Sequence, residues 1–273
     1  MITVVIPTLN AEATLGACLR SLRAQETPID QIIIVDGGST DTTVQIARAT
    51  ADIVLTSSAN RSLQRNAGWQ MATSPIVLFV DADMVLDPYV VTACEDVFNR
   101  MPSVVGLVIP EQSYGTTFWS RVKAFERTFY QNVWWMEAAR CFRRDCLIRV
   151  GGYDPALIGG EDWDLDERVR QYSRVERIQP IIWHNEQDLT LERVLLKKGH
   201  YASTLSVYAA RHPRRAKRQL SLASRLQLFA RRPWSLLIHP ILAVGLLIMG
   251  SNEWWTQKYP NETDEFKAER PIQ

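Results

Sequence analysis

Three uninterrupted apolar runs, rich in β-branched residues, constrain the fold more than any other feature of this chain. They cover residues 2–6, 32–35 and 76–80. Uninterrupted runs of this length, unlike alternating ones, predict strands covered on both faces, as in parallel sheets. The amphipathic stretches between them predict helices at about residues 11–25, 41–50 and 61–73. This alternation predicts an α/β fold, with a doubly wound, mostly parallel sheet flanked by helices.

Small, polar or acidic residues follow each of the three runs. The first run is followed by Pro7, Thr8 and Glu12, the second by Asp36, and the third by Asp81 and Asp83. In open parallel sheets, ligands bind beyond the carboxyl ends of the strands. We therefore expect a binding site along this edge of the sheet.

Asp81 and Asp83 flank a small residue at the end of the third run. In an extended segment their side chains point to the same side, where two carboxylates can hold a hard divalent cation. Such a cation would act as a Lewis acid toward a diphosphate leaving group. The alternative is an acidic loop that only caps the next helix.

Asp36 comes directly after its strand, where its carboxylate can accept hydrogen bonds from a base or a ribose. The alternative is an Asp-Gly turn whose Ser39 or Thr40 caps a helix, and both can hold at once. Arg65 could donate to phosphate oxygens or form a salt bridge on a helix surface. His184 ends an apolar run and could complete a metal shell, or serve as a hydrogen-bonded structural residue.

Several carboxylates gather after Gly159 and Gly160 at a predicted helix start, namely Glu161, Asp162 and Asp164. A helix N-terminus stabilises carboxylates, which is a purely structural explanation. The same acids, beside a tryptophan that can stack on a sugar ring, also suit a general base that faces an acceptor hydroxyl.

Four segments together resemble the family 2 glycosyltransferases, which have the GT-A fold. They are VVIPTLNAEATL at residues 4–15, IIIVDGGSTDTT at 32–43, RSLQRNAGWQMATSPIVLFVDADM at 61–84 and FRRDCLIRVGGYDPALIGGEDWDL at 142–165. The segments occur in the family's order and spacing, and the resemblance spans roughly residues 1–210. Residues 109–119, 137–144 and 183–202 look like a subgroup found beside membrane-associated members.

The resemblance implies a role for each matching residue. The nucleoside of the donor would be held by Pro7, Thr8, Glu12 and Asp36. The diphosphate and its Mg²⁺ or Mn²⁺ would be bound by Asp81, Asp83 and a late histidine, His184. Arg65 would lie close to that charge. Asp162 would be the base for in-line attack with inversion, supported by Glu161 and Asp164. Acceptor contacts are expected at Glu137, Arg140, Trp163 and Asp164, although an internal ion pair explains Glu137 and Arg140 equally well. The QxxRW signature of processive synthases is missing, which favours transfer of a single sugar.

The charge balance argues against a general nucleic-acid binder, because the formal net charge is only +1. The excess of base is local and lies within residues 211–232. The four cysteines show no metal-binding spacing, so we expect reduced thiols in the core. The chain begins directly with the first strand run, so we expect the catalytic part to stay in the cytosol.

Residues 234–249 form an apolar run that His239 and Pro240 interrupt. It is shorter than the roughly 20 residues of a spanning helix, so a short span, an interfacial helix and a packed core helix all remain open. Upstream arginines and downstream tryptophans favour membrane contact. We expect a catalytic domain at 1–212, a basic and apolar membrane-associating segment at 213–250, and a polar tail at 251–273.

The sequence thus predicts a metal-dependent, inverting glycosyltransferase on the cytoplasmic face of a membrane. Its partners would be a nucleoside diphosphate sugar and an acceptor hydroxyl or lipid-linked acceptor. One alternative is a non-catalytic nucleotide- or sugar-binding subunit of a membrane glycan assembly. The other is a sugar-phosphate nucleotidyltransferase, although the Gly-rich basic loop that such enzymes use on a triphosphate is missing.

Overall fold

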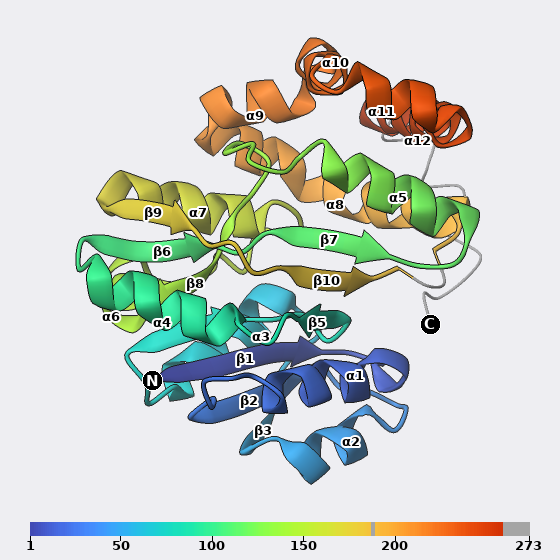
Figure 1. The fold of residues 1–273 in the computed structure, drawn as a ribbon. Helices are drawn as coiled ribbons and strands as arrows, with labels where there is room; N and C mark the ends of the chain where they lie inside the picture. Colours follow the sequence, from blue (N-terminus) through green and yellow to red (C-terminus); the bar gives the residue numbers. More distant parts are fainter. Residues whose placement is uncertain (187–188, 259–273) are drawn as a thin grey trace.

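The computed structural model describes residues 1–186 and 189–258, and a seven-stranded sheet forms its centre (Figure 1). The strand order is β3-β2-β1-β4-β8-β6-β9. The strands are β1 (Ile2–Thr8), β2 (Gln31–Asp36), β3 (Ile53–Thr56), β4 (Ile76–Phe79), β6 (Val104–Val108), β8 (Ala139–Arg143) and β9 (Arg174–Arg177). The three apolar runs therefore form β1, β2 and β4, as predicted.

The sheet is mostly parallel, with one reversed strand. The β1–β2, β2–β3, β1–β4 and β6–β9 pairs are parallel, whereas β8 runs antiparallel to both β4 and β6. A second sheet, ordered β5-β10-β7, contains β5 (Met84–Leu86), β7 (Glu111–Tyr114) and β10 (Ile182–Asn185). Because β5 follows Asp83 directly, this small sheet brings His184 of β10 beside the end of β4.

Helices flank the large sheet in the order α1 (Glu12–Arg23), α2 (Thr43–Thr50), α3 (Arg61–Met71), α4 (Val90–Arg100), α5 (Phe118–Thr128), α6 (Arg144–Val150) and α7 (Glu161–Tyr172). The first three match the amphipathic stretches of the sequence. The side chain of Asn60 accepts a hydrogen bond from the backbone N–H of Leu63 and so caps α3. Gly160 precedes α7 with a φ of +84°, a left-handed conformation that favours glycine.

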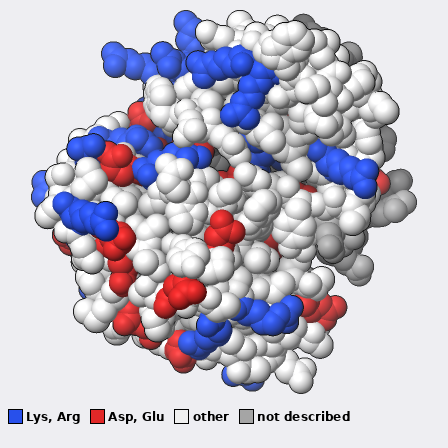
Figure 2. Space-filling view, viewed as in Figure 1, with Lys and Arg blue, Asp and Glu red and all other residues white. Residues whose placement is uncertain are grey.

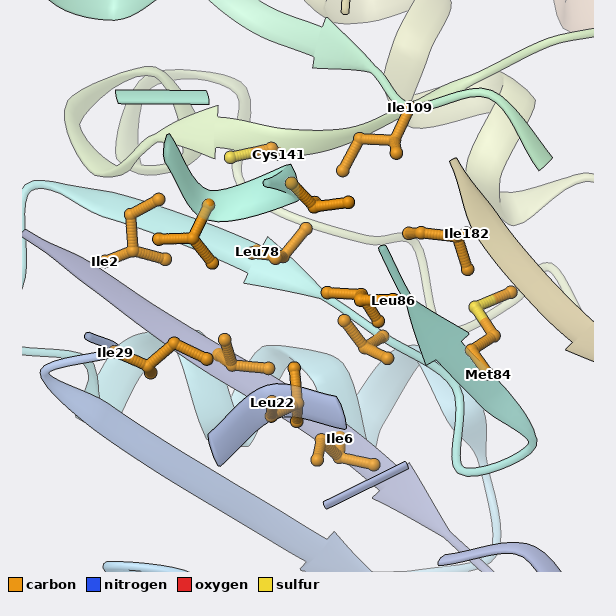
Figure 3. Close-up of a cluster of buried hydrophobic side chains, with 14 of the residues drawn as sticks. Ile2, Ile6, Leu22, Ile29, Leu78, Met84, Leu86, Ile109, Cys141 and Ile182 are labelled. Atoms are coloured by element: carbon orange, nitrogen blue, oxygen red, sulfur yellow. The ribbon is translucent and has the colours of Figure 1, made fainter. Parts of the chain in front are cut away.

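The apolar strands bury both of their faces, as uninterrupted runs predict. Along β1, the side chains of Ile2, Val4 and Ile6 enter one core cluster, whereas Val5 enters the cluster on the opposite face. Figure 3 shows the first cluster, which contains Ile2 and Ile6 of β1, Leu22 of α1 and Leu78 of β4. Helices therefore cover both faces of the sheet, and the prediction of an α/β fold is confirmed.

The C-terminal helices are α8 (Leu191–Arg211), α9 (Pro213–Leu220), α10 (Leu222–Ala230), α11 (Pro233–Ile238) and α12 (Pro240–Lys258). Of these, α9 to α12 lie at the top of Figure 1 and α8 lies below them. Pro240 begins α12, and it separates the apolar run into two helices because proline fixes φ and lacks an N–H. Within the described residues, no helix is both long and apolar enough to cross a membrane.

The helix α12 is anchored to the catalytic part through α5. Leu246 and Met249 of α12 are buried with Val122 and Phe125 of α5. Gly245 permits the close approach, since a Cβ there would lie 2.5 Å from Cγ2 of Val122. Residues 245–249 of α12 therefore pack tightly on α5.

The boundary expected at residue 212 lies between two helices, whereas the one expected at residue 251 lies within a helix. Residue 212 separates α8 from α9, whose Arg215 is buried against Asp166 of α7, with Nη1 at 2.6 Å from Oδ2. Residue 251 lies within α12, and the tail beyond residue 258 lies outside the described residues. All four cysteines are buried and free.

Candidate active site

The ends of β1 and β2 meet at Asp36, as the parallel register requires. The Oγ1 of Thr8 donates to Oδ1 of Asp36 at 3.0 Å, and the backbone N–H groups of Gly38 and Ser39 donate to Oδ2 at 2.9 and 2.8 Å. Burial alone would raise the pKa of Asp36, but hydrogen bonds from Ser39, Thr8 and Gly38 outweigh it and lower the pKa. Asp36 therefore stays ionised and fixes the loop after β2.

The other expected nucleoside residues lie on the same edge. Pro7 is buried in β1, opposite Val35 of β2. Glu12 begins α1 and is exposed, and its Oε2 accepts hydrogen bonds from Oγ1 and the backbone N–H of Thr42 at 2.8 and 3.1 Å. The edge thus brings together the residues that the sequence assigned to the donor.

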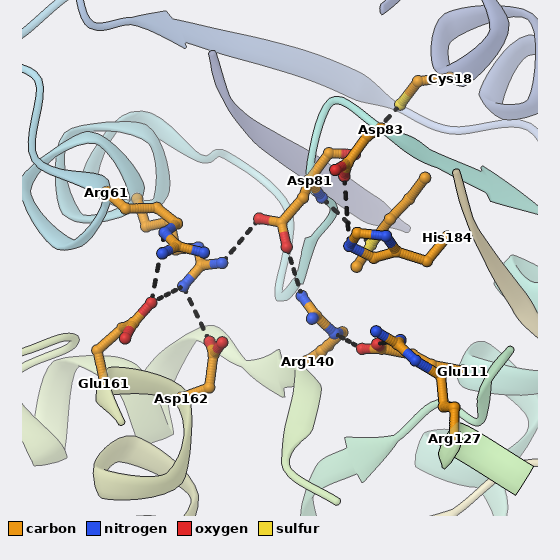
Figure 4. Close-up of polar contacts among 12 residues, drawn as sticks. Cys18, Arg61, Asp81, Asp83, Glu111, Arg127, Arg140, Glu161, Asp162 and His184 are labelled. Atoms are coloured by element: carbon orange, nitrogen blue, oxygen red, sulfur yellow. Dashed lines mark hydrogen bonds and ion pairs between the residues drawn. The ribbon is translucent and has the colours of Figure 1, made fainter. Parts of the chain in front are cut away.

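Asp81, at the end of the third apolar run, lies between two arginines. Its Oδ1 lies 2.7 Å from Nη2 of Arg65, and its Oδ2 lies 3.3 Å from Nη1 of Arg140 (Figure 4). Burial would raise the pKa of Asp81, but the two guanidinium groups outweigh it and hold the pKa far below its usual range. The carboxylate is therefore ionised and firmly oriented.

Arg65 connects Asp81 to the start of α7. Its side chain is completely buried, and its Nη1 lies 2.9 Å from Oδ1 of Asp162 and 3.5 Å from Oε1 of Glu161. The guanidinium also lies 5.0 Å from the centre of the Tyr153 ring. The buried guanidinium of Arg65 thus contacts both the expected donor carboxylate, Asp81, and the expected base, Asp162.

Arg140 continues the series of ion pairs toward the small sheet. It pairs with Glu111 of β7, and Glu111 pairs with Arg127 of α5. The Nη2 of Arg127 then lies 3.8 Å from Oε1 of Glu186, which lies 3.4 Å from Nδ1 of His184. Glu111, Arg127 and Glu186 were not predicted as site residues, because no spacing in the sequence links β7, α5 and the end of β10.

Asp83 and His184 form the part of the site that best suits a divalent cation. The Nε2 of His184 lies 3.5 Å from Oδ1 of Asp83, and the two side chains face each other in Figure 4. Burial lowers the pKa of His184, which favours the neutral imidazole that binds metals. No group of three or more His, Cys, Asp or Glu side chains in the described part of the chain is placed to hold a metal ion. Two protein ligands of this kind fit a cation such as Mn²⁺ that takes its other ligands from a diphosphate and water.

A cavity of about 520 Å³ opens beside this network. Its charged wall contains Glu111, Arg140, Glu161, Asp162 and His184. Its apolar wall contains Ile109, Met136, Trp163, Leu189, Val194, Leu205 and Leu220. The cavity thus runs from the expected base to the C-terminal helices, and it suits a molecule with both polar and apolar parts.

The four expected acceptor residues have different surroundings. Arg140 and Trp163 line the cavity, and Nε1 of Trp163 donates to the backbone carbonyl of Met136 at 2.9 Å. Glu137 also lines the cavity but pairs with Arg177, with Oε2 at 3.2 Å from Nε. Asp164 is buried outside the cavity, 2.8 Å from Nε2 of His212 and paired with Arg168. Asp164 therefore supports α7 from inside the protein.

The profile described as "Glycosyl transferase family 2" matches residues 3–154, which is more than half of the chain. The chain belongs to this family. It is 29% identical over 184 residues to a PGL/p-HBAD biosynthesis glycosyltransferase of Mycobacterium bovis, a match that covers 62% of this chain and 69% of the relative. It is also 29% identical over 189 residues to the succinoglycan biosynthesis protein ExoA of Rhizobium meliloti, which covers 61% of this chain and 57% of ExoA. The chain is therefore a glycosyltransferase.

Solved structures of low sequence identity share its fold. The mannosyltransferase PcManGT of Pyrobaculum calidifontis, in complex with GDP-Man and Mn²⁺, superposes with a TM-score of 0.60 at 17% identity and covers 98% of this chain and 88% of its own. TarS of S. aureus (residues 1–349), in complex with UDP-GlcNAc, gives a TM-score of 0.56 at 16% identity, covering 97% and 92%. This family 2 enzyme therefore has the GT-A fold predicted from its motifs.

Proposed function

We propose that this glycosyltransferase moves a single sugar from a nucleoside diphosphate sugar to an acceptor hydroxyl with inversion, and that the reaction depends on a divalent cation. The observation that carries the proposal is the buried guanidinium of Arg65, which contacts both Asp81 and Asp162. It fixes the donor carboxylate and the base on two sides of one rigid group. Such fixed spacing is what an in-line transfer requires.

Asp162 is the base in this proposal, and Glu161 supports it. Both acids line the cavity, but the side chain of Asp162 is one-quarter exposed, whereas that of Glu161 is 5% exposed and held between Arg61 and Arg65. Burial and the neighbouring Asp162 raise the pKa of Glu161. Of this pair, the more exposed Asp162 is the one that we propose accepts a proton from an acceptor hydroxyl in the cavity.

The donor would occupy the edge formed by Thr8, Asp36 and Asp81, with its diphosphate near Asp83 and His184. A bound Mg²⁺ or Mn²⁺ would supply Lewis-acid stabilisation of the leaving diphosphate. Asp83 and His184 would hold this cation, while Arg65 and Arg140 keep Asp81 in place beside it. UDP and GDP are the first donor nucleotides to test, because TarS and PcManGT were solved with UDP-GlcNAc and GDP-Man.

Calorimetric titration tests the donor site. UDP, GDP, CDP and dTDP are titrated into the wild type and into Asp83→Ala, each with and without Mn²⁺. We expect one nucleotide to bind only with the cation, and this binding to be lost in Asp83→Ala. Equal binding with and without Mn²⁺ would contradict the role of the cation.

Turnover tests the base. With the nucleotide sugar chosen by titration and a membrane extract as the source of acceptor, Asp162→Asn should release nucleoside diphosphate about 10²- to 10⁴-fold more slowly at unchanged donor affinity. Asp145→Asn is the matched control, since Asp145 is an exposed acid in the first turn of α6. If the wild type turns over the donor and Asp162→Asn is fully active, the base is a different residue. If the wild type turns over none of the donors, a non-catalytic subunit is favoured.

A further inference from the structure

Between residues 240 and 250, the helix α12 is apolar on the side that faces away from the protein as well as on the side that faces α5. Leu246 and Met249 are buried, whereas Ile241, Val244 and Leu247 on the opposite side are 72%, 55% and 65% exposed. A helix that is apolar all round is normally buried in a large core or in lipid. Between residues 240 and 250, the exposed side of α12 therefore lacks the polar residues expected of a surface helix in water.

The neighbouring helices extend this apolar surface. In α11, Trp234, Leu237 and Ile238 are 73%, 68% and 70% exposed. We call these six residues of α11 and α12 the C-terminal apolar face: Trp234, Leu237, Ile238, Ile241, Val244 and Leu247. Leu222 and Leu226, one turn apart on α10, are also exposed. An exposed apolar surface carried by three consecutive helices indicates an interaction site.

The chain segment that carries this surface has charges of one sign. From residue 193 to residue 252 the sequence contains Lys and Arg but no Asp or Glu. Arg231 and Arg232, between α10 and α11, are exposed next to Trp234. Figure 2 shows blue side chains over the region of α9 and α10, beside a white surface that extends over α11 and α12. A partner that fits both features is apolar inside and anionic at its surface.

We propose that the C-terminal apolar face docks on an anionic lipid bilayer, with Trp234, Leu237 and Ile241 in the interfacial layer and Arg231 and Arg232 on the headgroups. Interfacial helices combine such an apolar face with Lys and Arg in this way. A tryptophan at the edge of the apolar surface suits the boundary between lipid and water. A second copy of this chain fits less well, because it would bring two basic surfaces together.

Docking in this orientation would place one end of the cavity at the bilayer. Leu220 at the end of α9 and Arg225 of α10 line the cavity, and α10 also carries the exposed Leu222 and Leu226. We infer that the acceptor is membrane-anchored and reaches Asp162 along the apolar wall of the cavity. This second step rests on the proposed function, whereas docking itself does not.

Vesicle sedimentation tests the docking. The full chain is mixed, without any nucleotide sugar, with phosphatidylcholine vesicles that contain either no or 30% phosphatidylglycerol. The double variant Leu237→Gln/Ile241→Gln should bind the anionic vesicles at least tenfold more weakly than the wild type. Ile148→Gln/Met71→Gln is the matched control, because Ile148 and Met71 are 59% and 50% exposed on α6 and α3. Both variants change exposed side chains, so a thermal melt should show that the fold is intact.

Three results would overturn docking. They are no sedimentation of the wild type with anionic vesicles, equal binding by the double variant, and a wild-type dimer in solution that the double variant converts to a monomer without any vesicle binding. Nucleotide titration of the same samples separates this inference from the proposed function. A protein that binds nucleotide but no vesicle retains the proposed function, and one that binds vesicles but no nucleotide retains only the docking.

Discussion

The arginines of the active site and those of the C-terminal helices have opposite surroundings. Arg65 is completely buried and Arg140 is 11% exposed, and carboxylates from several elements surround both. Arg231 and Arg232 are exposed, within sixty residues that contain no acid in sequence. The first pair has its counter-charges inside the chain. The counter-charges of the second pair are expected from a partner.

This contrast separates two uses of the same side chain. A buried guanidinium with several partners is rigid, and removing it leaves carboxylates without compensation. An exposed guanidinium adds little to folding but attracts anions over a distance set by the salt concentration. Substitutions in the two regions should therefore act on different measurements.

The largest effect is expected for Arg65→Met. It should lower the free energy of unfolding by about 3–5 kcal/mol, because Asp81 and Asp162 would lose the buried guanidinium that they share. Arg232→Met should change it by no more than about 0.5 kcal/mol. Urea unfolding followed by circular dichroism measures both. Similar losses in the two variants would remove the distinction between the regions.

A smaller, pH-dependent effect is expected for Glu111→Gln. Burial would raise the pKa of Glu111, but Arg140 and Arg127 outweigh it and lower the pKa from 4.5 to about 2. Ionised Glu111 therefore stabilises the fold by about 2–3 kcal/mol above pH 4.5, and this contribution is lost as the pH falls toward 2. Urea unfolding at pH 7, 5, 4 and 3 should show the difference between wild type and variant shrinking with acidity. A constant difference would mean that Glu111 acts through packing and not through its charge.

The smallest effect is expected for Arg231→Gln and Arg232→Gln. Each should weaken binding to anionic vesicles about fivefold, since one base near an anionic surface contributes about 1 kcal/mol. Their unfolding curves should match those of the wild type. Arg100→Gln is the control, because Arg100 is also exposed but pairs with Asp96 on α4. Sedimentation at 0.1 and 1 M NaCl measures the effect, which high salt should abolish; a loss that is the same at both salt concentrations would contradict an electrostatic role.

The positions of Thr8, Asp36 and Asp81 could be predicted from sequence because they depend on local rules, whereas their proposed role in donor binding stays a prediction. Apolar runs gave the strands, and the parallel arrangement then placed Thr8, Asp36 and Asp81 on one edge. The glycines before Glu161 marked the start of α7 correctly. Each of these predictions needs only a pattern within a short segment.

The rest of the site depends on contacts between distant segments. Glu111, Arg127 and Glu186 become neighbours only when β7, α5 and the end of β10 come together, and no periodicity encodes that. For Arg65, the sequence left open contact with phosphate and a surface salt bridge, and its complete burial between Asp81 and Asp162 depends on residues far away in the chain. The run at residues 234–249 was also ambiguous, because its composition did not show which side of α12 packs on α5.

The cavity has two walls from two parts of the chain, and this matters for engineering. Its charged wall comes from the catalytic part, whereas Leu205, Leu220 and Arg225 come from the helices after residue 190. A chimera that takes α8 to α12 from a relative would keep the donor edge and replace much of the opposite wall. We then expect the transplanted helices to determine which acceptor the chimera uses. Libraries of such chimeras would therefore vary the product while the activated sugar stays the same.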